Sequence, residues 1–153
     1  MAFRPRYQFD AFIIILEIIS LQSIFYTTFF SIILLSDYAK NTPFLLDQVF
    51  NPLYLVSIKS YRLSSIIALY FSGISTAISF SLLVGRHRKA LDFITTTYGI
   101  HLIYIICIHF FPKSSIWWCY HLSSWAISCF LAEFISFKIE SQSIDVASII
   151  PTL

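Results

Sequence analysis

Charged side chains are scarce in this sequence, and four long stretches contain none of them. Asp, Glu, Lys and Arg make up 12% of the residues, against 58% apolar residues and a mean hydropathy of +0.78. Such a composition leaves too little polar surface to cover a water-soluble domain. The uncharged stretches are residues 18–36, 63–84, 93–112 and 114–132. Because a helix needs about 20 mostly apolar residues to cross a hydrocarbon core about 30 Å thick, each can span a membrane.

Glycine and cysteine are also rare, with three of each in the chain. Few glycines and apolar runs that do not alternate with polar residues argue against a transmembrane β-barrel, which leaves helices as the spanning structure. All three cysteines fall within predicted spans, so they indicate no disulfide framework. We therefore predict an all-α fold, a polytopic membrane protein built as an antiparallel bundle of four transmembrane helices. The expected spans are residues 11–36, 63–84, 91–111 and 116–137.

Catalytic and metal-binding motifs are missing as well. No nucleophile and base pair and no phosphate-binding glycine loop can be recognised, so we expect neither an enzyme nor a cofactor. A net charge of +2 is too small to indicate a nucleic-acid partner. His101, His109 and His121 are candidate metal or haem ligands, but only His109 and His121 lie near the outer ends of their spans, so only these two could meet at one depth. Two histidines without a carboxylate make a weak site, so we expect no metal or haem there.

The charges that are present indicate the topology. The five residues 85–89 contain Arg86, Arg88 and Lys89, and this basic turn favours the cytosolic side. Four spans then place both termini in the cytosol, with a lumenal loop at 37–62 and a flexible cytosolic tail at 138–153. Within the loop, residues 44–53 predict either a short interfacial helix, with Gln48 on its polar face, or an apolar loop packed over the bundle.

Small residues recur at four-residue spacing in the second and fourth spans. Ser72 and Thr76 follow Ala68, and Ser128 and Ala132 follow Ser124. Such stripes let helix backbones approach closely inside a membrane. We interpret them as packing seams.

Ionisable residues within the spans are the candidates for function, because a charge in the bilayer core is costly without a partner. Glu17 and Glu133 are expected about 9 and 6 Å below the cytosolic boundary, and Asp92 opens the third span at the same face. With Gln22, these residues predict a polar concavity open to the cytosolic leaflet. In the simpler alternative, Glu133 pairs with Lys138 or reaches the interface, and Asp92 only caps its helix.

A transporter or channel is the alternative function, with the intramembrane carboxylates as a proton or cation route. That function needs polar residues through both leaflets, and the outer half offers mainly Ser, Thr, His and Tyr. A lipid-handling enzyme is a third class, for which no catalytic constellation is visible. The sequence does not indicate an oligomeric state.

Eight segments follow one another in a distinctive order: Tyr7-Gln8-Phe9-Asp10, Leu21-Gln22, Leu46-Asp47-Gln48-Val49-Phe50, Arg62-Leu63-Ser64, Leu91-Asp92-Phe93, His101-Leu102, Phe111-Pro112-Lys113-Ser114-Ser115-Ile116-Trp117-Trp118 and Ala132-Glu133. Through these segments, from about residue 7 to about residue 145, the chain resembles the Sys family of Golgi integral membrane proteins. The resemblance implies a four-span Golgi membrane receptor that recruits an Arf-related small GTPase with an acetylated N-terminus, in support of vesicle trafficking. Glu17 stands where the family has a neutral amide, which leaves Gln22, Asp92 and Glu133 as the main candidates for partner binding. Arg86, Arg88 and Lys89 are then expected at the rim.

Overall fold

The computed structural model describes residues 11–56 and 59–149, with side chains described at 11–56 and 61–142. Its long helices are α1 (Ala11–Lys40), α4 (Lys59–Leu83), α5 (Ala90–His109) and α6 (Ser115–Ile149), and these ranges contain no strand. All four are long and apolar enough to cross a membrane. The predicted all-α, four-span class is therefore confirmed. Arg4, Arg6, the segment 7–10 and residues 150–153 lie outside the described residues.

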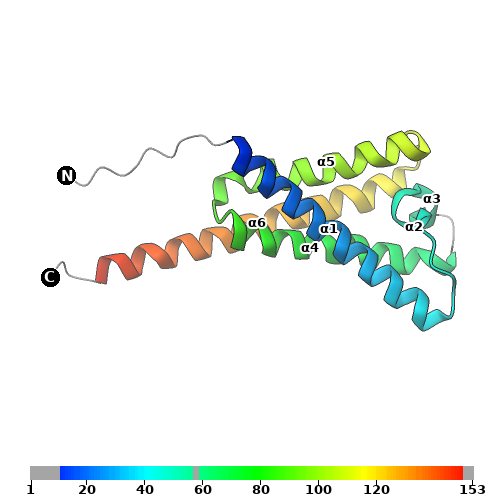
Figure 1. The fold of residues 1–153 in the computed structure, drawn as a ribbon, viewed down its shortest axis with the longest axis horizontal. Helices are drawn as coiled ribbons and strands as arrows, with labels where there is room; N and C mark the ends of the chain where they lie inside the picture. Colours follow the sequence, from blue (N-terminus) through cyan, green and yellow to red (C-terminus); the bar gives the residue numbers. More distant parts are fainter. Residues whose placement is uncertain (1–10, 57–58, 150–153) are drawn as a thin grey trace.

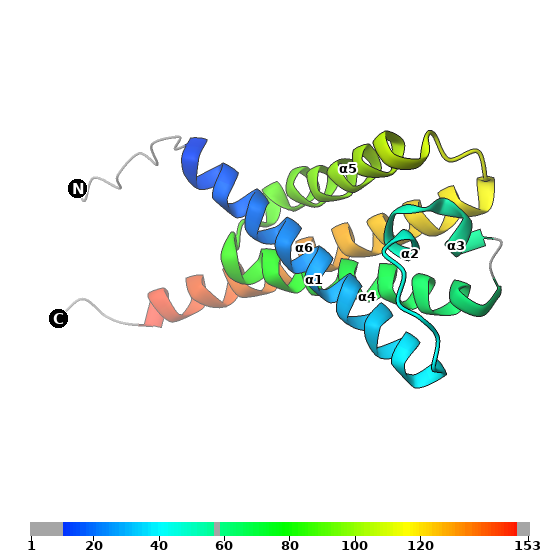
Figure 2. The same cartoon turned by 45° about the vertical axis from the view of Figure 1, so that its right-hand side comes forward.

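Consecutive long helices run in alternating directions along the longest axis (Figure 1). The start of α1, the 3-10 helix η1 (His87–Lys89) and the later part of α6 lie at one end, hereafter the turn end. The short helices α2 (Asp47–Phe50) and α3 (Pro52–Val56) lie at the other end with residues 110–114, hereafter the loop end (Figure 2). Each long helix therefore joins the two ends.

The core forms where α1 packs on α4 and α4 packs on α6. On α1, Leu21, Phe25, Phe29 and Ile33 are fully buried, and their four-residue spacing places them on one face. Both small-residue stripes are buried as well. Ser136, four residues after Ala132 on α6, donates a hydrogen bond of 3.0 Å to the hydroxyl of Ser81 on α4. The prediction that the stripes are packing seams is confirmed.

The segment between α1 and α4 differs from both alternatives expected for it. It holds two short helices, because Asn51-Pro52 interrupts the helical pattern: proline has no N–H to donate and restricts the residue before it. Gln48 was expected on a polar face, but it is completely buried, while Leu46 and Leu53 are exposed. The prediction that Gln48 lies on a polar face is therefore wrong, while the position of the segment relative to a membrane stays a prediction.

The tail also differs from the prediction. α6 continues without a break to Ile149, so residues 138–149 are helical rather than flexible. At the other boundary, α1 continues to Lys40, four residues beyond the expected end of the first span. Both differences have one cause: a helix does not stop where its residues become polar, and neither boundary carries a proline or glycine that would end it.

Candidate functional site

The chain reverses sharply between α4 and α5. Gly85 has a φ of 63°, in the left-handed region that glycine adopts without steric cost. Its N–H and that of Val84 donate to the Phe80 carbonyl at 3.2 and 2.9 Å, which caps the last turn of α4. This reversal allows η1 to pack against α6.

His87 joins η1 to α6 through an ion pair and a ring contact. Its Nδ1 atom lies 2.5 Å from Oε2 of Glu140, and its ring stands edge-on to Phe137 with centroids 5.7 Å apart. Both ion-pair partners are partly exposed, so water weakens their attraction. These two contacts are hereafter the clasp.

A hollow of about 320 Å³ lies next to the clasp. It is lined by His87 and by Phe130, Glu133, Phe134 and Phe137 of α6, whose spacing places the four on one helix face. Glu133 is exposed and forms no hydrogen bond or ion pair with any residue whose side chain is described. This turn-end hollow therefore combines an aromatic wall with one carboxylate that can accept hydrogen bonds.

The other charged candidates lie outside the turn-end hollow, although they belong to the same end of the bundle. Asp92 is exposed in the first turn of α5, where a carboxylate complements the helix dipole. Glu17 is half-buried on α1. Arg86 and Arg88 are exposed and Lys89 is half-buried, close to His87 in the chain. Asp92 and Glu17 are not part of this hollow, and the role of the three cations at its rim stays a prediction.

Gln22 lines a different hollow, of about 630 Å³, between α1 and α5. Its amide nitrogen and oxygen are buried next to Tyr26, but neither forms a hydrogen bond with the described residues. The Tyr26 hydroxyl lies instead 3.2 Å from Nδ1 of His101. The single concavity expected from the sequence is therefore replaced by two separate hollows, one with Gln22 and one with Glu133. Their roles in partner binding stay predictions.

The histidines meet in a pair that the sequence analysis did not expect. His121 stacks between Trp117 at 4.6 Å and His101 at 5.6 Å, measured between ring centroids. His109 instead places Nε2 3.8 Å from Oδ1 of Asp47. The histidine that stacks on His121 is therefore His101, and not His109, which the count of residues along the spans had placed at the same depth. Among the described residues, no three His, Cys, Asp or Glu side chains are grouped closely enough to hold a metal ion.

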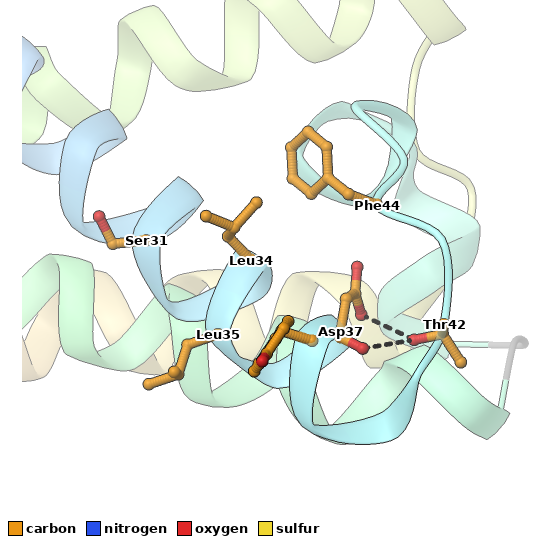
Figure 3. Close-up of a pocket in the computed structure, with 7 residues that line it drawn as sticks. Ser31, Leu34, Leu35, Asp37, Thr42 and Phe44 are labelled. Atoms are coloured by element: carbon orange, nitrogen blue, oxygen red, sulfur yellow. Dashed lines mark hydrogen bonds between the residues drawn. The ribbon is translucent and has the colours of Figure 1, made fainter.

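Asp37 is a candidate that sequence reasoning missed. Of the acidic residues with described side chains, it alone is buried, at 1% exposed. Gln48 donates a hydrogen bond of 2.6 Å to Oδ2. The Thr42 hydroxyl contacts Oδ1 and the main-chain carbonyl of Asp37 at 3.4 Å (Figure 3). Asp37 also lines a hollow of about 690 Å³ with Leu34 and Phe44. The sequence signal that could have identified Asp37 was an acidic residue within one helical turn of an apolar run, followed by Thr42.

The four long helices are apolar, and the hollows lie along their sides. Together, these features define a small polytopic α-helical membrane protein. The chain belongs to the SYS1 family, described as integral membrane protein S linking to the trans Golgi network, whose family model matches residues 5–146. This membership places it among integral membrane proteins of the Golgi network.

Individual relatives agree with the family. The chain is 30% identical over 141 residues to Protein SYS1 homolog of Nematostella vectensis, covering 91% of this chain and 88% of the relative. It is 26% identical over 138 residues to Protein SYS1 homolog of Dictyostelium discoideum, covering 88% of this chain and 58% of the relative. No solved structure matches.

Proposed function

We propose that this protein is a Golgi membrane receptor that recruits an Arf-related small GTPase with an acetylated N-terminus, and that the GTPase docks at the turn end. Family membership supports the Golgi setting. The GTPase itself comes from the resemblance described above. The structure contributes the candidate docking position, which is the turn-end hollow.

The observation that carries the proposal is the position of Glu133. Its carboxylate is exposed among phenylalanines within a candidate span, Ser115–Gln142, and has no partner in the described part of the chain. A carboxylate among apolar side chains at a membrane surface is stabilised by a hydrogen-bond donor that arrives together with hydrocarbon. An apolar helix with an amide donor at its tip provides both.

Acetylation gives a protein N-terminus this chemistry. It replaces a charged ammonium with a neutral amide whose N–H still donates. That N–H can donate to Glu133, while apolar side chains of the incoming helix contact Phe130 and Phe134. A single amphipathic helix binds membranes weakly, so the receptor supplies the second interaction that holds the GTPase at one membrane.

The cations at the rim extend this docking position toward the aqueous phase. Arg86, Arg88 and Lys89 are neighbours in the chain of His87, which lines the hollow. They attract acidic groups of the GTPase or anionic lipid headgroups within about 10 Å at 0.1 M salt. The proposal places the turn end, and with it both termini, in the cytosol.

The test uses purified protein in liposomes and an acetylated, GTP-bound Arf-related GTPase. Glu133→Gln and Glu133→Ala should lower the amount of bound GTPase several-fold. Asp47→Asn, which changes an exposed acid at the loop end, is the matched control and should bind normally. An unacetylated GTPase should bind wild type as poorly as it binds Glu133→Ala. Equal binding to wild type and to both Glu133 variants would remove the hollow from the proposal, and ion flux through the same liposomes would instead favour a transporter.

A further inference from the structure

His87 lines the turn-end hollow together with Glu133, and only one of its two ring nitrogens is occupied. Nδ1 lies 2.5 Å from Oε2 of Glu140 in the clasp. Nε2 forms no hydrogen bond with any residue whose side chain is described, and it is accessible, in contrast to the enclosed nitrogens of His121. Because the ring lines the hollow, Nε2 is the nitrogen that a ligand there can reach.

Glu140 decides what this open nitrogen offers to a ligand. A carboxylate only accepts hydrogen bonds, so the hydrogen shared by the two side chains sits on Nδ1 of His87. In the neutral imidazole one nitrogen donates and the other accepts, so Nε2 becomes an acceptor. Of the described residues that line the hollow, Glu133 and His87 then present acceptors, and the three phenylalanines present no polar side-chain atom. The hollow therefore fits a ligand that brings two donors.

A cation and the first turn of a helix both bring paired donors, and the hollow fits the helix better. A cation would lose its hydration among Phe130, Phe134 and Phe137, which lie in a candidate span, and it would be repelled by the cations that flank His87 in the chain. The first N–H groups of a helix have no partner within that helix, and they follow one another at a rise of about 1.5 Å. They are neutral, yet they carry the positive end of the helix dipole, which favours a carboxylate.

We propose that the turn-end hollow binds the first turn of a helix that begins at the partner's acetylated first residue, and that His87 is a specificity-determining residue for this turn. The amide N–H of the acetylated residue donates to Glu133, and the N–H of the next residue donates to Nε2 of His87. The inference rests on the proposed function, which supplies the partner, and it adds a requirement for conformation. Successive residues of an extended chain point in opposite directions, so an extended N-terminus does not reach both acceptors.

The experiment measures binding of a synthetic acetylated peptide, with the sequence of the N-terminal helix of the Arf-related GTPase, to the full chain in phosphatidylcholine liposomes. A second peptide has an ester in place of the amide between its first and second residues, which removes the N–H proposed to reach His87. Binding to liposomes without protein is subtracted. Wild type should bind the ester peptide about three- to tenfold more weakly than the amide peptide, as expected for one hydrogen bond.

Two variants assign this loss to the ring nitrogen. His87→Phe keeps a ring against Phe137 without any nitrogen, so it should bind the amide peptide about three- to tenfold more weakly and bind both peptides within about twofold of each other. Glu140→Ala breaks the clasp but keeps Nε2, so it is the control for loosening of α6 and should still favour the amide peptide more than about twofold. An ester loss of the same factor in wild type and His87→Phe would overturn the role of His87, and so would the absence of an ester loss in Glu140→Ala.

Failure of the proposed function gives a different pattern. If the acetylated amide peptide binds wild type no better than protein-free liposomes, or binds Glu133→Gln as well as wild type, the docking position is wrong and this inference falls with it. Dependence on Glu133 without dependence on His87 overturns this inference alone. Equal binding of an unacetylated peptide to wild type would show that the hollow takes a cation, which overturns both.

Discussion

His101 and His121 stack in the interior of the bundle, with ring centroids 5.6 Å apart and ring planes 22° from parallel. One ring comes from α5 and the other from α6. Trp117 stacks on His121, and the Tyr26 hydroxyl makes a hydrogen-bond contact with His101. The pair therefore links three of the four spans, and it explains why the two helices pack with these faces together.

The stability of the pair depends on ring shape at His121 rather than on its nitrogens. In detergent, His121→Ala should lower the free energy of unfolding by about 2–4 kcal/mol, because it leaves a cavity between two rings. His121→Phe should leave it unchanged or raise it by up to about 1 kcal/mol, because it removes two unbonded nitrogens. Unfolding in a denaturing detergent, followed by circular dichroism, measures both. A large loss in His121→Phe would mean that the nitrogens have a partner.

The meeting of His101 and His121 could have been predicted from the short connection between their helices. His101 lies eight residues before the end of α5 and His121 six residues after the start of α6, which is about 12 and 9 Å from the loop. Adjacent antiparallel helices place such residues at similar depth. The depth of His101 was counted from the opposite end of its span, so its match with the depth of His121 was missed. The spans themselves followed directly from the uncharged runs.

Asp37 and Gln48 form a buried pair that should hold the segment containing α2 against α1. Asp37→Ala leaves the Gln48 amide without its 2.6 Å acceptor, so it should lower the free energy of unfolding by about 1–3 kcal/mol. Gln48→Ala should cost a similar amount. The double variant should be less destabilised than the sum of the two single changes, since each has already removed the same bond.

The control for this pair is Asp47→Asn, an exposed acid at the start of α2. It should change the free energy of unfolding by less than about 0.5 kcal/mol, as surface substitutions usually do. Strict additivity of the Asp37 and Gln48 variants would show that the two side chains act independently, contrary to the contact in the structure.

Gly73 and Gly99 provide a matched pair of helix glycines in opposite surroundings. A Cβ at Gly73 would overlap the hydroxyls of Ser128 and Tyr98, where α4 meets α6 and α5. Gly73→Ala should therefore lower the free energy of unfolding by about 1–3 kcal/mol. Gly99→Ala meets open space and should be neutral or stabilising by up to about 1 kcal/mol, since alanine favours helix. Equal effects at both sites would contradict the packing of α4 on α6.

The sequence could not predict which side chains of residues 44–53 are buried, because their burial depends on long-range contacts. Gln48 lies within residues 44–53, where the predicted helix had it on the polar face, but Asp37, eleven residues away, is its buried partner. Glu133 and Gln22 show the same limit at the candidate site. Their depth along each helix could be counted, whereas the direction each faces depends on how α1, α5 and α6 pack.

The clasp between His87 and Glu140 should hold the later part of α6 against η1. Glu140→Gln removes the charge from the pair, so amide hydrogen exchange in residues 138–142 should become faster. Because the partners are partly exposed, 1 M salt should speed exchange in wild type but add little in Glu140→Gln. His87→Phe separates the two contacts, since it retains a ring against Phe137 without the ion pair and should match Glu140→Gln. If salt instead speeds exchange equally in all three proteins, the ion pair does not hold this part of α6, and the wall of the turn-end hollow depends on Phe137 alone.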